Sequence, residues 1–357
     1  MRPNRGGATL WVGSLLMFCI GLAGCQEDYR EWDGVPDIKC EGDWCHYEGW
    51  FGIGVDQIWG ADQENIYVCG WQQILFFDGE NFSEVYRHKD SYVINVRFMD
   101  IWGSGKDDVW VVGSPDTFID DTNPGEIVHC VSGRCVRQHN HTPGTLVAVH
   151  GSSADNVWAV GSQSAVLHYD GQSWNALASP ASTVWTDVAT FGPGEVWLVG
   201  YDDNIWRMHQ GAWEQVETGL GSGKRHFTSL WAGAPDDVWF FGFWDSDKTC
   251  ILMHWDGDSI KRFELPWADG WTVGLGNVWT SYVGGLNAHD FWVTGDPLWH
   301  WDGQNWLQLS IPLKHFANEI WTDRAGEFWI TGSMTMENTE GEPIHFYIHH
   351  YKPYLRR

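Results

Sequence analysis

The sequence is poor in positive charge: 21 Lys and Arg residues stand against 47 Asp and Glu residues, and the formal net charge is −26 at pH 7. Proteins bind nucleic acids largely through contacts of Lys and Arg with phosphates, so this balance argues against a nucleic-acid partner. Anionic lipid headgroups would repel the same surface. Solubility alone is a sufficient explanation of a large negative charge.

Long hydrophobic runs are also scarce. The run Leu10–Ile20 (LWVGSLLMFCI) is shorter than the roughly 20 apolar residues that a membrane-spanning helix needs. Arg2 and Arg5 precede it and small residues follow it, which is typical of a signal peptide. No other segment is long and apolar enough to cross a membrane.

The segment Leu22-Ala23-Gly24-Cys25 resembles the bacterial lipobox. The resemblance implies cleavage before Cys25, attachment of lipid to this cysteine and a membrane anchor. Gln26 rather than Asp implies the outer membrane. Cleavage would leave a net charge of 19 − 47 = −28. The alternative is an ordinary signal peptide followed by an unrelated cysteine. We expect a signal peptide over 1–24, a lipidated tether and possible closing strand over 25–50, and one folded domain over 51–357.

Recognisable catalytic motifs are missing. The sequence contains no GxSxG, HExxH, P-loop or CxxC motif. Paired acids such as Asp107-Asp108 recur at the same point of several repeats, which is typical of turns, where Asp accepts local backbone N–H bonds. His139 and His141 are too few to hold a metal ion alone. We therefore predict a binding protein and not an enzyme.

The dominant feature is an internal repeat. A glycine closing a VWxVG-like segment recurs at intervals of 37 to 53 residues, at Gly70, Gly113, Gly161, Gly200, Gly242, Gly295 and Gly332. Each copy contains short Val- and aromatic-rich runs bounded by Gly, Asp and Asn, which predict strands and turns. This combination predicts an all-β fold, a seven-bladed β-propeller of four-stranded antiparallel blades. The last copy has room for three strands, so Ile38–Trp50 is the candidate strand donor that closes the ring.

Of the 27 tryptophans, 18 fall at repeat positions. The first strand of the copies carries Trp59, Trp102, Trp231, Trp279 and Trp321, and the second carries Trp110, Trp158, Trp197, Trp239, Trp292 and Trp329. Large rings between blades bury much area, so we expect these residues to serve packing.

The cysteines favour an oxidising compartment. Cys130 and Cys135 flank a predicted hairpin, and Cys40 and Cys45 could close a small loop, so these four are disulfide candidates. Cys69 and Cys250 belong to blades that are not neighbours and are expected to be buried free thiols.

The VWAVG and LHYDGxxW segments resemble the repeat of a large group of bacterial propeller lipoproteins, over residues 57–351. This resemblance implies a propeller in the cell envelope but no defined activity. The copy GEVWLVGYDDNIWRMHQGAWEQV is similar to a tectonin repeat, which implies a lectin of surface glycans. A sialidase Asp-box is similar in placement to HYDGQSW, but here Asp and Gly are adjacent, so no site residue carries over.

Long loops between repeats are expected on one face of the propeller, where binding usually resides. Trp244, Trp267 and Trp271 lie in these loops and are candidate ligand anchors, or they fold back over the blades. The acidic loop with Asp116, Asp120 and Asp121 is a weak candidate for Ca²⁺. No other cofactor is indicated.

These features support three hypotheses. The first is a monomeric envelope lipoprotein that binds a protein partner or scaffolds a complex. The second is a tectonin-like lectin, and the third and weakest is a glycan-active enzyme.

Overall fold

The computed structural model describes residues 37–48, 55–88, 96–115, 125–138, 144–221, 223–246, 249–263, 265, 283–287, 289–294, 298–309, 315–324, 326–334 and 346–352. These residues form seven antiparallel sheets, as the repeat predicts. The single helical element among them is the short 3₁₀ turn η1 (Ser162–Ser164). No helix in the described part of the chain is long and apolar enough to span a membrane.

Six sheets are blades of four strands that follow each other in the chain. They are β3 (Val55–Asp62), β4 (Asn65–Gly70), β5 (Gln73–Phe77) and β6 (Phe82–Arg87); β7 (Val96–Gly105), β8 (Asp108–Pro115), β9 (Glu126–Val131) and β10 (Arg134–Gln138); β11 (Leu146–Ser153), β12 (Asn156–Gly161), β13 (Val166–Tyr169) and β14 (Trp174–Ala176); β15 (Trp185–Gly192), β16 (Glu195–Gly200), β17 (Ile205–His209) and β18 (Ala212–Gln215); β19 (Arg225–Ala234), β20 (Asp237–Trp244), β21 (Cys250–Trp255) and β22 (Ile260–Phe263); β23 (Val283–Asn287), β24 (Asp290–Val293), β25 (Leu298–Trp301) and β26 (Trp306–Leu309).

The seventh blade joins the two ends of the propeller. It contains β27 (His315–Arg324), β28 (Glu327–Met334) and β29 (Phe346–Tyr351), and then β2 (Trp44–Glu48) and β1 (Asp37–Glu41). β2 pairs with β29 over Trp44–Tyr351 to Glu48–Tyr347, and β1 adds a fifth strand outside it. The donor predicted at Ile38–Trp50 therefore supplies two strands, and this blade has five strands where four were predicted.

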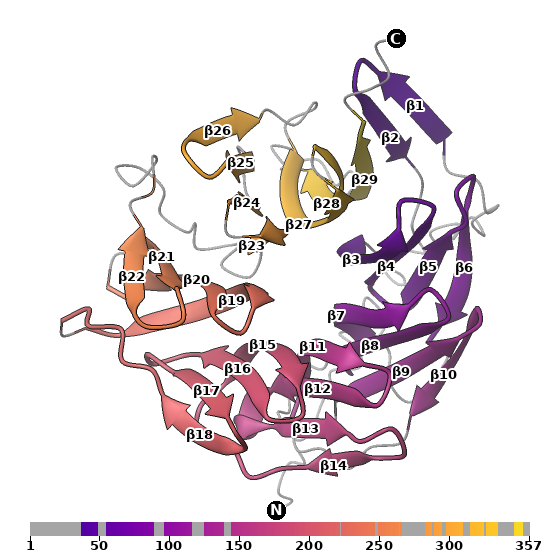
Figure 1. Cartoon of the computed structure of the whole chain (residues 1–357). Coiled ribbons are helices and arrows are strands. Elements are labelled where there is room, and N and C mark those ends of the chain that lie inside the picture. Colours follow the sequence, from indigo (N-terminus) through magenta and orange to yellow (C-terminus); the bar gives the residue numbers. More distant parts are fainter. Residues whose placement is uncertain are drawn as a thin grey trace, which may run out of the picture. The chain divides into compact units, whose positions relative to one another are not determined.

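The first strand of each blade is the innermost, and successive inner strands pack side by side around an axis (Figure 1). β27 packs against β3, so the ring of blades is closed. Closure covers the apolar sheet faces that the first and last blades would otherwise expose. The apolar core lies between neighbouring blades; one cluster joins Tyr67 and Cys69 of the first blade to Val109 and Val128 of the second.

Tight Asp-Gly turns connect the third and fourth strands of four blades. In the second such turn, the Asp170 carboxylate accepts the N–H groups of Gln172 and Ser173, and Gly171 has a φ of 87°. Asp78, Asp256 and Asp302 make the same bonds in their own turns. Glycine tolerates this positive φ at low cost, which explains the recurrence of the dipeptide.

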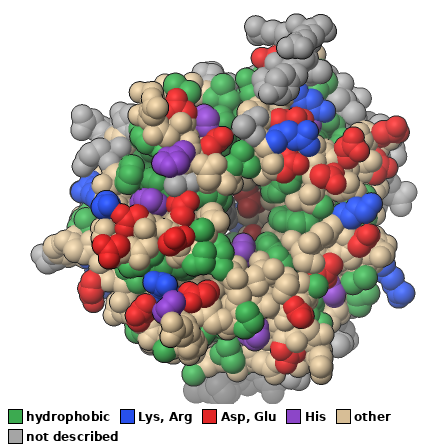
Figure 2. Space-filling view, viewed as in Figure 1, with side chains coloured by type: hydrophobic (Ala, Val, Ile, Leu, Met, Phe, Trp, Pro, Cys, Tyr) green, Lys and Arg blue, Asp and Glu red, His purple; other side chains and the backbone are tan. Residues whose placement is uncertain are grey.

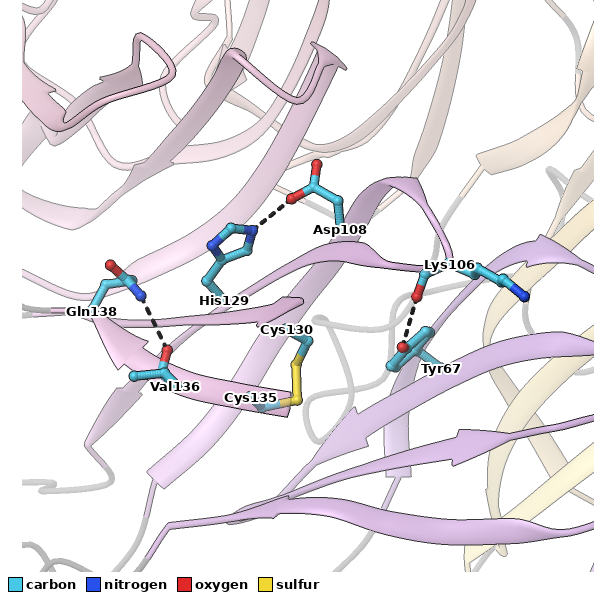
Figure 3. The surroundings of a disulfide bond; sticks show 8 residues. All are labelled: Tyr67, Lys106, Asp108, His129, Cys130, Cys135, Val136 and Gln138. Atoms are coloured by element: carbon cyan, nitrogen blue, oxygen red, sulfur yellow. Dashed lines mark hydrogen bonds and ion pairs between the residues drawn. A yellow bond between two sulfur atoms is a disulfide. The ribbon is translucent and has the colours of Figure 1, made fainter. Parts of the chain in front are cut away.

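Both predicted disulfides are formed. Cys40–Cys45 joins β1 to β2, and Cys130–Cys135 joins β9 to β10 (Figure 3). Each links two residues directly opposite each other in a hairpin. Cys69 and Cys250 are free and buried, as predicted.

The sixth blade departs from the predicted alignment. Gly284 of β23 pairs with Trp292, just as Trp102 of β7 pairs with Trp110. Gly284 therefore occupies the inner-strand position that the repeat assigned to Trp279, and Trp279 itself lies outside the described residues. The assignment was wrong because it rested on the local match of the motif, whereas the position is defined by the register of β23 against β24.

Candidate functional site

The inner strands of all seven blades line a central cavity of about 310 Å³. Figure 2 shows the hollow at the centre of the molecule, with acidic side chains deep inside it and a histidine at its edge. Ligand sites are usually concave, with apolar walls and a few convergent polar groups. This cavity is therefore the candidate site of the described part of the chain.

Four half-buried indole rings lie on the wall of the cavity, those of Trp59, Trp102, Trp231 and Trp321. Three of them rest on a glycine of the next blade. A Cβ atom added at the glycine would come within 2.7 Å of Trp59 at Gly103, 2.4 Å of Trp102 at Gly151 and 2.7 Å of Trp321 at Gly60. These rings are thus both packed and accessible from the cavity, whereas the sequence predicted packing alone.

The repeat places a glycine at the equivalent position of the next blade wherever the inner position holds Trp. The pairs are Trp59 with Gly103, Trp102 with Gly151, Trp231 with Gly285, and Trp321 with Gly60, and the first, second and fourth of these are in contact. Where it does not, the next blade has a larger residue; these pairs are His150 with Thr190, Ala189 with Ala232, and Gly284 with Thr322. The recurring IWG motif therefore encodes a contact between blades.

Three carboxylates face the same cavity, those of Asp100, Asp187 and Glu319. Asp100 accepts the N–H of Ile101 in its own blade and that of Val149 in the next, both at 2.7 Å. Each carboxylate thus ties its inner strand to the following blade.

The other two acids make equivalent bonds. Asp187 accepts the N–H groups of Val188 at 2.7 Å and Leu230 at 2.8 Å. Glu319 accepts the N–H of Ile58 across the closure of the ring, at 2.5 Å. None of the three acids was predicted from the sequence, although each precedes the recurring apolar residue of an inner strand by one position.

Burial makes these carboxylates hard to ionise. Burial, then the nearby charge of Asp187, raises the pKa of Asp100 well above its ordinary value. Burial raises the pKa of Asp187 to about 7. Burial, then the charge of Asp100, raises the pKa of Glu319. The carboxyl groups of Asp100, Asp187 and Glu319 therefore hold their protons more tightly than free carboxyl groups do, and ionising them inside the cavity costs free energy.

Positive charge is missing from the cavity wall. Among the described residues that line it there is neither Lys nor Arg. His150 lies on the wall, accepts the N–H of Thr190 at Nδ1 over 3.2 Å, and is neutral because burial lowers its pKa to about 4. By contrast, the nearby buried Asp56 has a countercharge, since Arg97 donates to it at 2.9 Å.

A second layer of tryptophans lies between the blades and is closed to solvent. Trp110, Trp158, Trp197, Trp239, Trp292 and Trp329 of the second strands are between 0% and 7% exposed. In the fifth blade, Trp239 stacks on His254 with ring centroids 4.2 Å apart, and His254 Nε2 bonds to Asp237 at 2.8 Å. Indole, imidazole and carboxylate thus form one unit.

This unit recurs in other blades. The pairs are His129 with Asp108, His168 with Asn156, His300 with Asp290 and His350 with Glu327, each His close against the Trp of its blade. Figure 3 shows His129 and Asp108. Arg207 replaces the histidine over Trp197 in the fourth blade. The signal was present in sequence as an acid or amide two residues before Trp and, in three of the blades, as a His before Tyr-Asp or Trp-Asp. The unit accounts for five of the 16 histidines.

Of the anchors predicted in loops, Trp244 is described. It lies at the end of β20 and not in a loop, and Arg225 lies over its ring at 4.7 Å. Arg225 is itself buried and paired with Asp203. Trp244 is half-buried on this support and is not part of the central cavity.

The remaining candidates lie outside the described residues. These are Cys25, Trp267, Trp271, Asp116, Asp120 and Asp121. Within the described ranges, no group of three or more His, Cys, Asp or Glu side chains is placed to hold a metal ion.

Comparison with known proteins supports the fold. No family model matches the chain, and no curated protein matches it in sequence. Among solved structures, YCF48 bound to D1 peptide has a TM-score of 0.60 at 14% identity and covers 89% of this chain and 99% of its own. YCF48 from Cyanidioschyzon merolae has a TM-score of 0.60 at 14% identity, covering 87% of this chain and 99% of its own. The RRP9 WD40 repeats have a TM-score of 0.59 at 11% identity, covering 87% and 99%. At these identities the likeness establishes the seven-bladed propeller fold and nothing finer.

Proposed function

We propose that this chain is a non-catalytic, lipid-anchored protein of the bacterial cell envelope whose propeller binds a protein partner. The observation that carries the proposal is the central cavity, which sets accessible indoles and carboxylates on a rigid, closed scaffold. Aromatic side chains on a rigid support are typical anchors of protein interfaces. A similar propeller, YCF48, has been solved with a bound peptide, which supports this class of ligand.

The anchor and the location rest on the sequence. Leu22-Ala23-Gly24-Cys25 supports lipid attachment at Cys25, and Gln26 supports the outer membrane. Mass spectrometry of the purified mature protein tests this directly. We expect an acylated Cys25 at the N-terminus in the wild type and an unprocessed chain in Cys25→Ser. A mature N-terminus at any other residue would contradict the proposed anchor.

Partner binding is tested by capture from detergent extracts of the native envelope. We expect the wild-type protein to retain a specific protein, and Trp267→Ala/Trp271→Ala to retain less if the predicted loop anchors contribute. Retention of nothing above a bare-resin control would contradict the proposed function. Equal retention by the double variant would exclude only those two anchors.

A lectin remains the alternative because of the tectonin-like copy at residues 194–216. A glycan array with the soluble domain separates the two functions. We expect no sugar to bind selectively; selective binding of a surface glycan would replace the protein-partner proposal.

A further inference from the structure

We propose that the central cavity receives a cationic side chain, the ammonium of a lysine or the guanidinium of an arginine, presented by the protein partner. The proposal rests on the proposed function and adds the chemistry of the contact. A cation that enters the cavity meets the carboxyl groups of Asp100, Asp187 and Glu319, which its positive charge helps to ionise, and the indoles on the same wall, a ring type that attracts cations.

The three cavity carboxylates have no Lys or Arg near them among the described residues that line the cavity. The hydrogen bonds to the three cavity carboxylates come from backbone N–H groups and, at Asp187, also from the Ser229 side chain, and none of these donors carries a net charge. Asp56, outside the cavity wall, is neutralised by Arg97 of the chain itself. An ionised carboxylate in a poorly solvated place is costly unless a positive charge joins it. The cavity is therefore complementary to a cation from outside.

The side chains on the cavity wall and the volume of the cavity also suit a cationic side chain. Trp59, Trp102, Trp231 and Trp321 are half-buried and line the cavity together with the acids. Tryptophan is the best aromatic partner for a cation, and the gain grows when the cation is desolvated. A volume of about 310 Å³ accommodates a long side chain, which can bury its aliphatic stem against the indoles and place its charge among the carboxylates.

The spacing of the acids bears on whether the cation is a metal ion or an organic group. The acids of the described residues do not gather tightly enough to hold a metal ion. An ammonium has three N–H donors and a guanidinium has five, so one such group can reach carboxylates that are spread around a wall. These observations favour an organic cation over a metal ion.

The test uses the peptide Ac-Gly-Lys-Gly-NH₂ and its norleucine counterpart as probes, with saturation-transfer NMR and competition to rank affinities. We expect the lysine peptide to bind at least tenfold more tightly than the norleucine peptide. The cavity variant Asp100→Asn/Asp187→Asn/Glu319→Gln keeps side-chain oxygens that accept the backbone bonds but removes the charge. We expect it to bind the lysine peptide at least tenfold more weakly than the wild type.

The overall charge of the protein requires a matched control. Glu80→Gln/Glu217→Gln/Asp258→Asn removes the same charge from exposed positions and is expected to change binding less than twofold. Equal loss in both triple variants, or equal binding of the two peptides, would overturn the proposal. Circular dichroism and the thermal midpoint confirm that each variant is folded. If the cavity triple variant does not fold, the single variant Asp187→Asn takes its place, with an expected loss of at least threefold.

Capture from the envelope extract distinguishes failure of the cation proposal from failure of the proposed protein-binding function. Retention by the wild type that is unchanged in the cavity variant would contradict the cation proposal and leave partner binding intact. Retention by neither protein would contradict partner binding, while the peptide titration would still decide whether the cavity accepts a cation.

Discussion

The two tryptophan layers come from the same repeat but lie in different surroundings. The second-strand indoles are shut between blades, and most stack on a histidine that an acid or amide holds in place. The inner-strand indoles rest on glycines and remain reachable from the cavity. The difference teaches that a repeated aromatic position supports packing where neighbouring blades enclose the ring, and becomes available for binding where the ring borders the central cavity. The following predictions test this distinction.

Replacing one tryptophan of each layer by alanine is expected to show the largest difference in stability between the two layers. Trp239→Ala is expected to lower the free energy of unfolding by about 3–5 kcal/mol, because it leaves a large cavity between blades and strips His254 of its stacking partner. Trp231→Ala, in the inner strand of the same blade, is expected to cost about 1–2 kcal/mol, since its ring is half-buried. Urea titration measures both. Equal losses would mean that the layers do not differ.

The contact between an inner-strand tryptophan and the glycine of the next blade can be tested by adding a methyl group to that glycine. Gly151→Ala places a Cβ 2.4 Å from the ring of Trp102 and is expected to cost about 1–3 kcal/mol. Trp102→Ala in the same chain should make the glycine substitution nearly neutral, which a double-mutant cycle measures. Gly105→Ala, where no atom lies within 4 Å, is the control. Additive losses at positions 102 and 151 would show that the ring and the glycine do not interact.

The histidine of the buried layer should contribute less than its tryptophan. His254→Ala is expected to cost about 1–2 kcal/mol, because it leaves the Asp237 carboxylate without this bond and uncovers one face of Trp239. His209→Ala removes an exposed histidine paired with Glu195 and is expected to cost at most about 0.5 kcal/mol. Thermal unfolding compares the two. A larger loss of stability in His209→Ala than in His254→Ala would contradict the structural role of the recurring Trp, His and acid unit.

The cavity acids predict a pH dependence with a definite sign. The pKa of Asp187 is raised from 3.8 to about 7 in the folded protein, so the folded state holds a proton that the unfolded chain releases between these values. The wild-type protein therefore loses stability as the pH rises from 3.8 to about 7. The stability of Asp187→Asn relative to the wild type is expected to increase by about 2–3 kcal/mol between pH 5 and pH 8. Thermal unfolding at both pH values measures the change, and an advantage confined to pH 5 would contradict the assigned direction.

Most of the fold was predictable because its determinants are local. The Asp-Gly turns and the VWxVG strands carry their own signals, and Cys40 and Cys45 were close enough in sequence to suggest a hairpin bridge. Gly284 was missed because the register of a strand depends on its partner, and Trp279 offered a better local match to the repeat.

The cavity was not predictable in the same way. Asp100, Asp187 and Glu319 come from three distant blades, and their proximity follows from closure of the ring. In sequence each is one acid among 47. The pairing of Trp with Gly in the next blade was readable from the sequence, but only after the blades were known to be neighbours in that order.

Hydroxyl-radical footprinting read by mass spectrometry tests the central claim most directly, since it measures the solvent exposure of each tryptophan separately. The account predicts that Trp59, Trp102, Trp231 and Trp321 are oxidised in the native protein, while Trp110, Trp158, Trp197, Trp239 and Trp329 are protected. Equal protection of both groups, or faster oxidation of the second, would contradict it.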